Sequence, residues 1–249
     1  MYPESVMDFH AEVFPGIGAP AADNLRPGDQ QEAWPQNRIM RFERRKGQAG
    51  LLGTLVSFPR GSHLYSEKEP ASYLYRLVSG VALGYRMTRD GRRQVVAFYV
   101  PSDLFGFELG SRHSFSVEAA SNVKVRMIKR SAISALAARD VGVAEELRSC
   151  LACELRRNQA HVLQLGKTAP ERVASFVLEL AERLSKNGTV DVLMARQDIA
   201  DYLGLTIETV SRTLTQLSSA GAIAFSGPRK IAIRDSRLLQ RMASEAVAA

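Results

Sequence analysis

The first half of the 249-residue chain carries a series of short runs in which β-branched and aromatic residues alternate with polar ones. Turn residues separate the runs, and this spacing is typical of the antiparallel strands of a sandwich or barrel. The runs are Leu51–Phe58, Tyr73–Leu77, Val81–Met87, Gln94–Tyr99 and Ser116–Ile128. The clearest hairpin joins the third run to the fourth, where Asp90-Gly91 would supply the positive φ angles of a tight turn. We therefore predict an antiparallel β domain.

After Arg130 the apolar residues recur at helical spacing, and this predicts a short helix over Ser131–Ala138 and a long one over Val141–Leu165. The long helix carries a narrow stripe with steps of three and four residues, as in a coiled coil. The stripe consists of Leu147, Leu151, Leu155, Asn158, Val162 and Leu165. Because other faces hold residues such as Arg148 and Arg156, we expect the stripe to pack against a second copy of the chain; an intramolecular core is the alternative.

The last third of the chain begins with a break in the helical pattern at Gly166. Thr168 to Glu171 form a capping box with a proline in the first turn, which predicts the start of another helix. Apolar residues then line one face of the segment Arg172–Leu184. This amphipathic helix is expected to pack on the elements that follow it.

A helix-turn-helix pattern follows. Arg196–Leu203 is predicted as a short helix, Gly204-Leu205 as a turn, and Thr206 as the N-cap of a second helix that reaches about Leu217. The apolar positions of this second helix, which would face the core, are Ile207, Val210, Leu214 and Leu217. The positions on another side are Glu208, Ser211, Arg212 and Thr215. A helix with these polar side chains on its outer side is suited to enter the major groove of DNA.

The chemistry of the outward side chains matches base edges. Arg212 can bond O6 and N7 of guanine, Glu208 can accept from N4 of cytosine, and Ser211 can serve thymine or a phosphate. A hairpin over residues 223–233, with a basic tip, would form a wing. The residues expected at the DNA backbone are Thr206, Thr209, Thr215, Arg229 and Lys230. The alternative is an ordinary amphipathic helix beside an incidental hairpin.

Composition adds modest constraints. The net charge is +7, which suits a polyanionic partner, but residues 167–249 hold 11 Lys and Arg against 9 Asp and Glu. DNA affinity there must come from the placement of charges. With two cysteines and neither a signal peptide nor a membrane-spanning run, the chain is expected to be cytoplasmic and without membrane contact.

Three stretches of this sequence resemble the CRP/FNR superfamily of bacterial regulators, and within it the FNR/FixK branch. They are Asp90–Gln94, Pro101–Gly106 and, most specifically, Arg196–Arg212; the resemblance covers about residues 51–238. It implies an α+β protein with a cyclic-nucleotide-binding-like β jelly roll, a long dimerisation helix and a C-terminal winged helix-turn-helix. It also implies a homodimer, an operator palindrome with TTGAT-like half-sites, and contact with RNA polymerase.

The expected boundaries divide the chain into four parts. They are a poorly ordered leader at 1–49, a β-barrel sensor-like domain at 50–130, a short helix and long dimerisation helix at 131–166, and a DNA-binding domain at 167–249. The leader carries little hydrophobic periodicity and several Pro and Gly residues.

Departures from the family pattern bear on cofactors. An iron–sulfur cluster needs about four thiolates, whereas no cysteine precedes Cys150. Cyclic-nucleotide receptors of the family present a Glu and an Arg to the phosphate, but His113-Ser114 stands about where Arg-Ser is expected, and Arg157-Asn158 replaces the helix hydroxyls. We expect no metal, no cyclic-nucleotide response and no cofactor.

Two alternatives stay open. A regulator of the same family could depend on haem, a small metabolite, or a redox switch at Cys150 and Cys153, although small residues in or beside the dimer helix interface are the plainer interpretation of that pair. A ligand or redox module that does not bind DNA is the second alternative. No P-loop, HExxH or GxSxG motif supports an enzyme.

Overall fold

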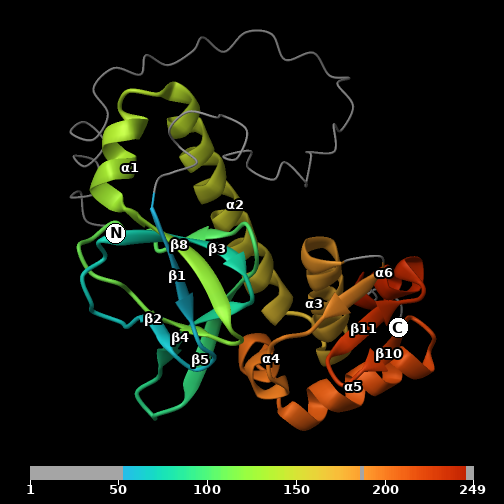
Figure 1. Ribbon diagram of the computed structural model, residues 1–249. Coiled ribbons are helices and arrows are strands. Elements are labelled where there is room, and N and C mark those ends of the chain that lie inside the picture. The colour runs from blue at the N-terminus through green and yellow to red at the C-terminus, as the bar shows by residue number, and fades with distance from the viewer. Residues whose placement is uncertain (1–52, 186–187, 245–249) are drawn as a thin grey trace, which may run out of the picture. The chain divides into compact units, whose positions relative to one another are not determined.

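The computed structural model describes residues 53–185 and 188–244, which lie within one compact unit spanning residues 39–249. The predicted leader at 1–49 lies outside the described residues. The strands of the first half are β1 (Thr54–Phe58), β2 (His63–Tyr65), β3 (Tyr73–Ser79), β4 (Ala82–Met87), β5 (Arg93–Tyr99), β6 (Leu104–Phe105), β7 (Ser116–Ala119) and β8 (Val123–Lys129). The elements that follow are α1 (Arg130–Ala137), α2 (Val141–Leu165), α3 (Ala169–Leu184), β9 (Thr189–Asp191), α4 (Arg196–Leu203), α5 (Ile207–Ser219), β10 (Ile223–Gly227), β11 (Lys230–Ile233) and α6 (Ser236–Ser244) (Figure 1).

The predicted β domain is confirmed as two four-stranded antiparallel sheets, ordered β1-β8-β3-β6 and β2-β7-β4-β5. Alternate residues of the strands face inward, because successive side chains of a strand point to opposite faces. A tightly packed group of aromatic rings lies inside the roll, namely Tyr65, Tyr75, Tyr99 and Phe105. The interior of the roll is therefore filled by the side chains of the protein itself.

The β domain differs from the sequence prediction in its details. The run Ser116–Ile128 is two strands, β7 and β8, separated by a turn at residues 120–122. The strand is interrupted there because the backbone N–H groups of Ala120 and Ser121 both donate to the Val81 carbonyl. Strands β2 and β6 were not predicted, since three and two residues are too short to show an alternating pattern. The β4–β5 hairpin is confirmed. However, only Gly91 of the Asp90-Gly91 pair has a positive φ, of 77°. The prediction for Asp90 was wrong; its carboxylate instead holds the turn by accepting from Thr88 and Arg92.

The long helix α2 has the predicted bounds, Val141–Leu165. Asp140 caps it by accepting from the backbone of Gly142 at 2.8 Å and Val143 at 3.3 Å. Towards its N-terminal end, one side of the helix packs on α1 and the β roll through Val143, Leu147 and Cys150. The helix therefore has an intramolecular face, which the predicted stripe overlaps at Leu147.

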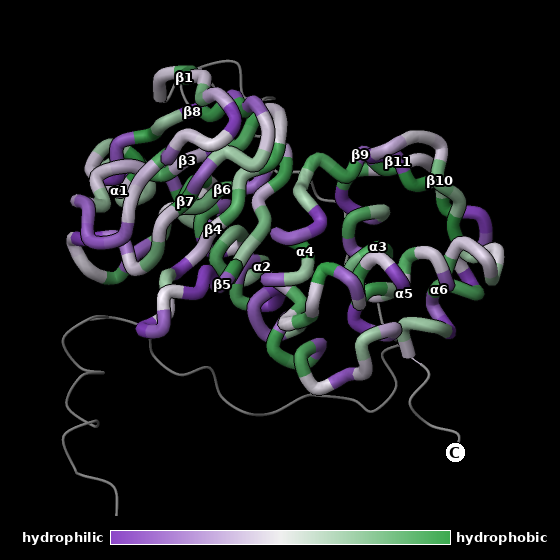
Figure 2. Tube along the Cα trace, turned by 90° about the horizontal axis from the view of Figure 1, so that it is seen from below, coloured by the Kyte–Doolittle hydropathy of each residue, from purple (hydrophilic) through white to green (hydrophobic). Residues whose placement is uncertain are grey.

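Helix α3 is the centre of the C-terminal part. Its predicted capping box is present, with the Glu171 carboxylate accepting from the backbone and hydroxyl of Thr168. Helices α3 and α5 alternate hydrophobic and hydrophilic positions, as Figure 2 shows, and their apolar sides meet in one core with α4 and α6. Strand β9 and helix α6 were not predicted. The same core continues into the β roll through Val81, Leu83 and Phe98.

Candidate nucleic-acid interface

The helix-turn-helix is built as the sequence predicts. Helix α4 ends at Gly204, whose φ of +63° is the left-handed conformation that favours glycine. Arg172 of α3 reinforces this end by donating to the Leu203 carbonyl at 2.9 Å. Thr206 then caps α5, its hydroxyl accepting from the Thr209 backbone at 3.2 Å. The buried side of α5, which includes Val210, Leu214 and Leu217, fixes the helix against α3 and α4.

The three predicted base-reading residues lie on the solvent side of α5. Glu208, Ser211 and Arg212 are all exposed. Within the described part of the chain, the side chains of Glu208 and Arg212 make no hydrogen bond or ion pair. Glu208 lies in the first turn, where the positive end of the helix dipole favours its carboxylate. An acceptor, a hydroxyl and a guanidinium are thus available to an outside partner.

The predicted backbone-contacting threonines have internal roles. The Thr206 and Thr209 hydroxyls lie 3.0 Å apart and share a hydrogen bond. The Thr215 hydroxyl donates to the Ser211 carbonyl at 3.0 Å. A hydroxyl has one hydrogen to donate, and a phosphate oxygen can only accept. Thr215 would have to turn away from α5 to bond a phosphate.

The predicted wing is the β10–β11 hairpin. Its turn is Pro228-Arg229, and Arg229 is exposed. Lys230 starts β11 instead of lying in the turn, with its ammonium 3.8 Å from the Asp191 carboxylate. Arg229 is therefore the more available cation. The wing also carries Phe225, which is 44% exposed. The Arg196 guanidinium lies over its ring in a cation–π contact, with the guanidinium carbon 5.9 Å from the ring centroid.

The predicted stripe on α2 divides between two environments. Leu147 is half-buried against the intramolecular cluster of α1 and the β roll. The remaining members of the stripe face solvent in the single chain, and the apolar ones among them are Leu151, Leu155, Val162 and Leu165. Asn158, the polar member, is exposed as well. An apolar row along a 25-residue helix is a surface suited to another helix.

The two cysteines of α2 point to different surroundings. Cys150 packs against the intramolecular cluster, and burial raises the pKa of its thiol to about 12. Cys153 is exposed, and neither residue is in a disulfide. A thiol with a raised pKa is a poor nucleophile at neutral pH, because the thiolate is the reactive form.

His113 and Glu108, the residues at the expected cyclic-phosphate position, are turned into the protein. His113 is 2% exposed and stacks on the Tyr65 ring with 3.6 Å between centroids. Burial lowers the pKa of its imidazole, against the opposing effect of Glu108, so the ring is neutral at pH 7. Glu108 accepts from the backbone and hydroxyl of Ser114 at 2.9 and 3.0 Å. No cation from this pair is offered to an anionic ligand.

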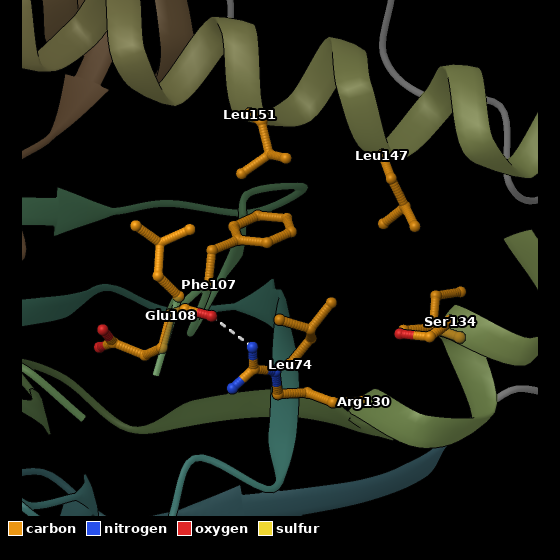
Figure 3. Close-up of a pocket in the computed structure, with 9 residues that line it drawn as sticks. Leu74, Phe107, Glu108, Arg130, Ser134, Leu147 and Leu151 are labelled. Atoms are coloured by element: carbon orange, nitrogen blue, oxygen red, sulfur yellow. Dashed lines mark hydrogen bonds between the residues drawn. The ribbon is translucent and has the colours of Figure 1, made fainter. Parts of the chain in front are cut away.

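A pocket of about 430 Å³ lies between the segment Phe107–Leu109, α1 and α2 (Figure 3). Its wall is largely apolar and includes Leu74, Leu147 and Leu151. The Arg130 guanidinium borders it but donates to the carbonyls of Ala71, Glu108 and Gly110. The pocket therefore suits an apolar group better than an anion.

The described ranges contain neither a metal-binding cluster nor a helix suited to cross a membrane. Among residues 53–185 and 188–244, no three or more His, Cys, Asp and Glu residues are grouped as they would be to hold a metal ion. None of the helices described there has the length and apolar character required to cross a membrane.

Comparison with known proteins identifies the architecture. The Crp-like helix-turn-helix domain matches residues 171–242, and the cyclic nucleotide-binding domain matches residues 55–140. The nitrogen fixation regulation protein FixK of Azorhizobium caulinodans is 45% identical over 199 residues, which is 78% of this chain and 80% of that protein. This chain belongs to the CRP/FNR family of transcription regulators. The predicted family is confirmed, and a regulator with a helix-turn-helix DNA-binding domain follows from it.

Further relatives place this CRP/FNR-family chain with the FixK proteins. FixK of Rhizobium meliloti is 37% identical over 197 residues, covering 78% of this chain and 85% of that protein. The structure of FixK2 from Bradyrhizobium japonicum superposes with a TM-score of 0.75 at 44% identity, covering 80% of this chain and 100% of the other. The FNR/FixK resemblance found in the sequence is therefore confirmed.

The position expected for the family's cyclic-nucleotide site holds residues of a different chemistry in this chain. The aromatic rings fill the interior of the roll, and a buried neutral His113 stands about where a guanidinium is expected. Arg157, about where a helix hydroxyl is expected, bonds Asp103 at 2.7 Å and Glu154 at 2.6 Å. The residues present do not fit a cyclic phosphate.

Sequence reasoning missed the residues that join the parts of the protein. Arg157 and Arg183 both bond Asp103, a residue of the family-like stretch Pro101–Gly106 for which the sequence predicted no role. Each arginine also has an acidic residue one helical turn away, Glu154 and Glu179, which is an ordinary surface pattern. The signal that could have found the cluster was a carboxylate in a tight turn with no local partner of opposite charge.

Proposed function

We propose that this chain is a FixK-type transcription regulator that binds, as a homodimer, a palindrome with TTGAT-like half-sites. The observation that carries the proposal is the outward face of α5, where Glu208, Ser211 and Arg212 are exposed together on a helix fixed by its buried side. The major groove of B-DNA admits such a helix. The proposed organisation keeps the parts 50–130, 131–166 and 167–249 as sensor-like domain, dimer helix region and DNA-binding domain.

Each half-site would be read by the same three side chains. Arg212 would bond O6 and N7 of the guanine, Glu208 would accept from the N4 amino group of a cytosine, and Ser211 would face a thymine or a phosphate. Arg229 on the wing would neutralise a phosphate. A good bidentate pair discriminates by about 1–3 kcal/mol, so the single G·C pair of TTGAT would depend mainly on Arg212.

A two-fold dimer matches a palindromic operator, because each protomer presents the same helix to one half-site. The exposed apolar row on α2 supplies a surface for such pairing. One relative, AadR of Rhodopseudomonas palustris, is named a transcriptional activatory protein and is 35% identical over 205 residues. We infer an activator that acts in the cytoplasm and contacts RNA polymerase.

The proposed regulator works without a cyclic nucleotide or an iron–sulfur cluster. The buried His113, the aromatic filling of the roll and the engaged guanidinium of Arg157 support this for the nucleotide. The two cysteines are too few for the four thiolates of a cluster. Its activity would then follow its abundance in the cell.

The test compares two duplexes, one with the intact palindrome and one with the G·C pair of each half-site changed. Wild type, Arg212→Ala and Arg237→Ala are titrated by fluorescence anisotropy at a fixed salt concentration. Arg237 is an exposed cation of α6, so its variant controls for the loss of charge. We expect Arg212→Ala to remove the preference for the intact site and Arg237→Ala to keep it. Equal preference in all three proteins would refute the assignment of Arg212.

A second candidate function is an effector-dependent regulator of the same family. The largely apolar pocket beside Phe107 and Leu151 favours this candidate, since a small hydrophobic molecule would pack against its apolar lining. An absorption spectrum of the purified protein tests for haem. For other effectors, the test is whether DNA binding is acquired only after a cell extract of small molecules is added. Site-selective binding by protein without additives would rule this candidate out.

A further inference from the structure

Asp103 lies in the tight turn between β5 and β6 and binds two arginines from different helices. One carboxylate oxygen accepts from Arg157 of α2 at 2.7 Å. The other accepts from Arg183 of α3 and from the backbone of Val100 at 2.8 Å. The three charged side chains are 13%, 29% and 18% exposed for Asp103, Arg157 and Arg183. One carboxylate thus joins the β roll, the long helix and the first helix of the DNA-binding part.

The turn holds this carboxylate firmly in place. Ser102 has a φ of +81°, and its backbone donates to the Leu77 carbonyl at 2.8 Å. The Leu77 backbone in turn donates to the Asp103 carbonyl at 2.9 Å. Strand β3 therefore holds the turn by two backbone hydrogen bonds, one with Ser102 and one with Asp103. Because of these bonds, the position of the Asp103 carboxylate is fixed by the β roll and not by the helices it binds.

The two arginines are also held by their own helices. Arg157 bonds Glu154 at 2.6 Å, and Arg183 bonds Glu179 at 2.9 Å. These two contacts cannot orient α3, since each joins residues of one helix. Asp103 is the acceptor common to both helices, and without its charge the two guanidinium groups would repel each other across a partly buried gap.

Apolar rings lie beside the ion cluster and complete the contact. Phe98 of β5 packs on Phe176 of α3 at 5.9 Å and meets Tyr202 of α4 edge-on at 5.0 Å between ring centroids. His161 of α2 stacks on Tyr202 at 4.0 Å. Burial of these rings supplies non-directional attraction, whereas charged hydrogen bonds specify geometry. The ring contacts therefore supply attraction without a fixed direction, and the ion cluster at Asp103 supplies directed hydrogen bonds beside them.

We propose that Asp103 is a positioning residue that sets the orientation of the winged helix-turn-helix relative to α2, and so fixes the spacing between the two recognition helices of a dimer. Helix α5 packs on α3, so a tilt of α3 at Arg183 would move Arg212 away from its base pair. This inference rests on the proposed function. A dimer held rigidly reads only half-sites at the correct separation, whereas a loosened one tolerates a wrong separation.

The test measures the affinity of each protein for two duplexes, the intact palindrome and the same palindrome with one base pair added between its half-sites. The variants are Asp103→Asn, Asp103→Glu and Arg183→Gln. Glu145→Gln is the matched control, because the Glu145–Arg148 pair of α2 is solvent-exposed and joins one helix only. Thermal unfolding of each variant checks that it is folded.

We expect wild type to prefer the intact palindrome strongly. Asp103→Asn should lower the affinity for the intact palindrome by about tenfold and the affinity for the lengthened one much less, so that the preference falls by a similar factor. Asp103→Glu should recover part of the preference. Arg183→Gln, which breaks the link between Asp103 and α3 together with the Glu179 pair inside α3, should lose the preference even if Asp103→Asn fails to fold. Glu145→Gln should behave as wild type.

Two results would overturn the inference in distinguishable ways. If wild type prefers the intact palindrome and the folded variants lose affinity equally for both duplexes, or lose none, Asp103 and Arg183 have no positioning role. If wild type binds both duplexes weakly and equally, the proposed function is wrong and this inference falls with it.

Discussion

Replacement of Leu155 by alanine should weaken the dimer. Leu155 lies near the middle of the exposed row on α2 and is 59% exposed in the single chain. Leu151 and Val162, one and two turns away, are 47% and 66% exposed. In a two-fold dimer the same side chain is buried twice, once from each protomer.

The magnitude follows from the area that remains to be buried. Full burial of a leucine stabilises by about 1.5–3 kcal/mol, so the exposed part of Leu155 is worth roughly 0.9–1.8 kcal/mol in each protomer. Alanine keeps one methyl group, so the loss per dimer should be about 1–3 kcal/mol. This corresponds to roughly a 5- to 150-fold rise in the dimer dissociation constant.

Sedimentation equilibrium over a range of protein concentrations measures that constant. Arg156→Ala is the control, because Arg156 is exposed on the same helix but lies about 100° around it from Leu155. The prediction is a clear rise for Leu155→Ala and little change for Arg156→Ala. A wild-type protein that stays monomeric at all concentrations, or two variants that dissociate alike, would refute the interpretation of the row as a dimer interface.

Three further predictions follow from single residues. Arg229→Ala should weaken binding to all DNA sequences equally and reduce the slope of log affinity against log salt by about 2 for a dimer; a change in sequence preference would argue against a phosphate contact. Burial depresses the folded-state pKa of His113 below its ordinary 6.5 despite Glu108 and Glu69, so its contribution to stability is present above that pH and is lost as pH falls through the folded value. The Tm advantage of wild type over His113→Phe should therefore shrink from pH 7.5 to pH 5.5, and an advantage that grows would contradict the neutral ring. Replacement of both Cys150 and Cys153 by serine should change DNA affinity by less than about threefold, whereas complete loss of binding would support the redox alternative.

The helix-turn-helix could be predicted from the sequence because its signals are local. Gly204 supplies the left-handed turn, Thr206 caps the next helix, and the steps between Val210, Leu214 and Leu217 define the buried side. The outward positions of Glu208 and Arg212 then follow from helical geometry alone. The same holds for α2, which was predicted from its helical spacing and the break at Gly166; the Asp140 cap at its other end was found only in the structure.

The remaining features depend on contacts between distant parts of the chain. Asp103 meets Arg183 across 80 positions of sequence, and no local pattern marks that pair. The stripe on α2 has the right period, but period alone could not assign Leu147 to the intramolecular cluster and Leu155 to solvent. Likewise, His113, in the segment between β6 and β7, is buried by stacking on Tyr65 of the distant strand β2.

Site-selective binding by the unmodified protein, with no nucleotide or other effector added, tests the central claim most directly. Purified wild type is titrated at about 150 mM salt against the intact TTGAT palindrome and against a duplex of the same composition in scrambled order. The proposed function predicts at least about a thousandfold preference for the palindrome. Weak and equal binding to both duplexes would contradict it.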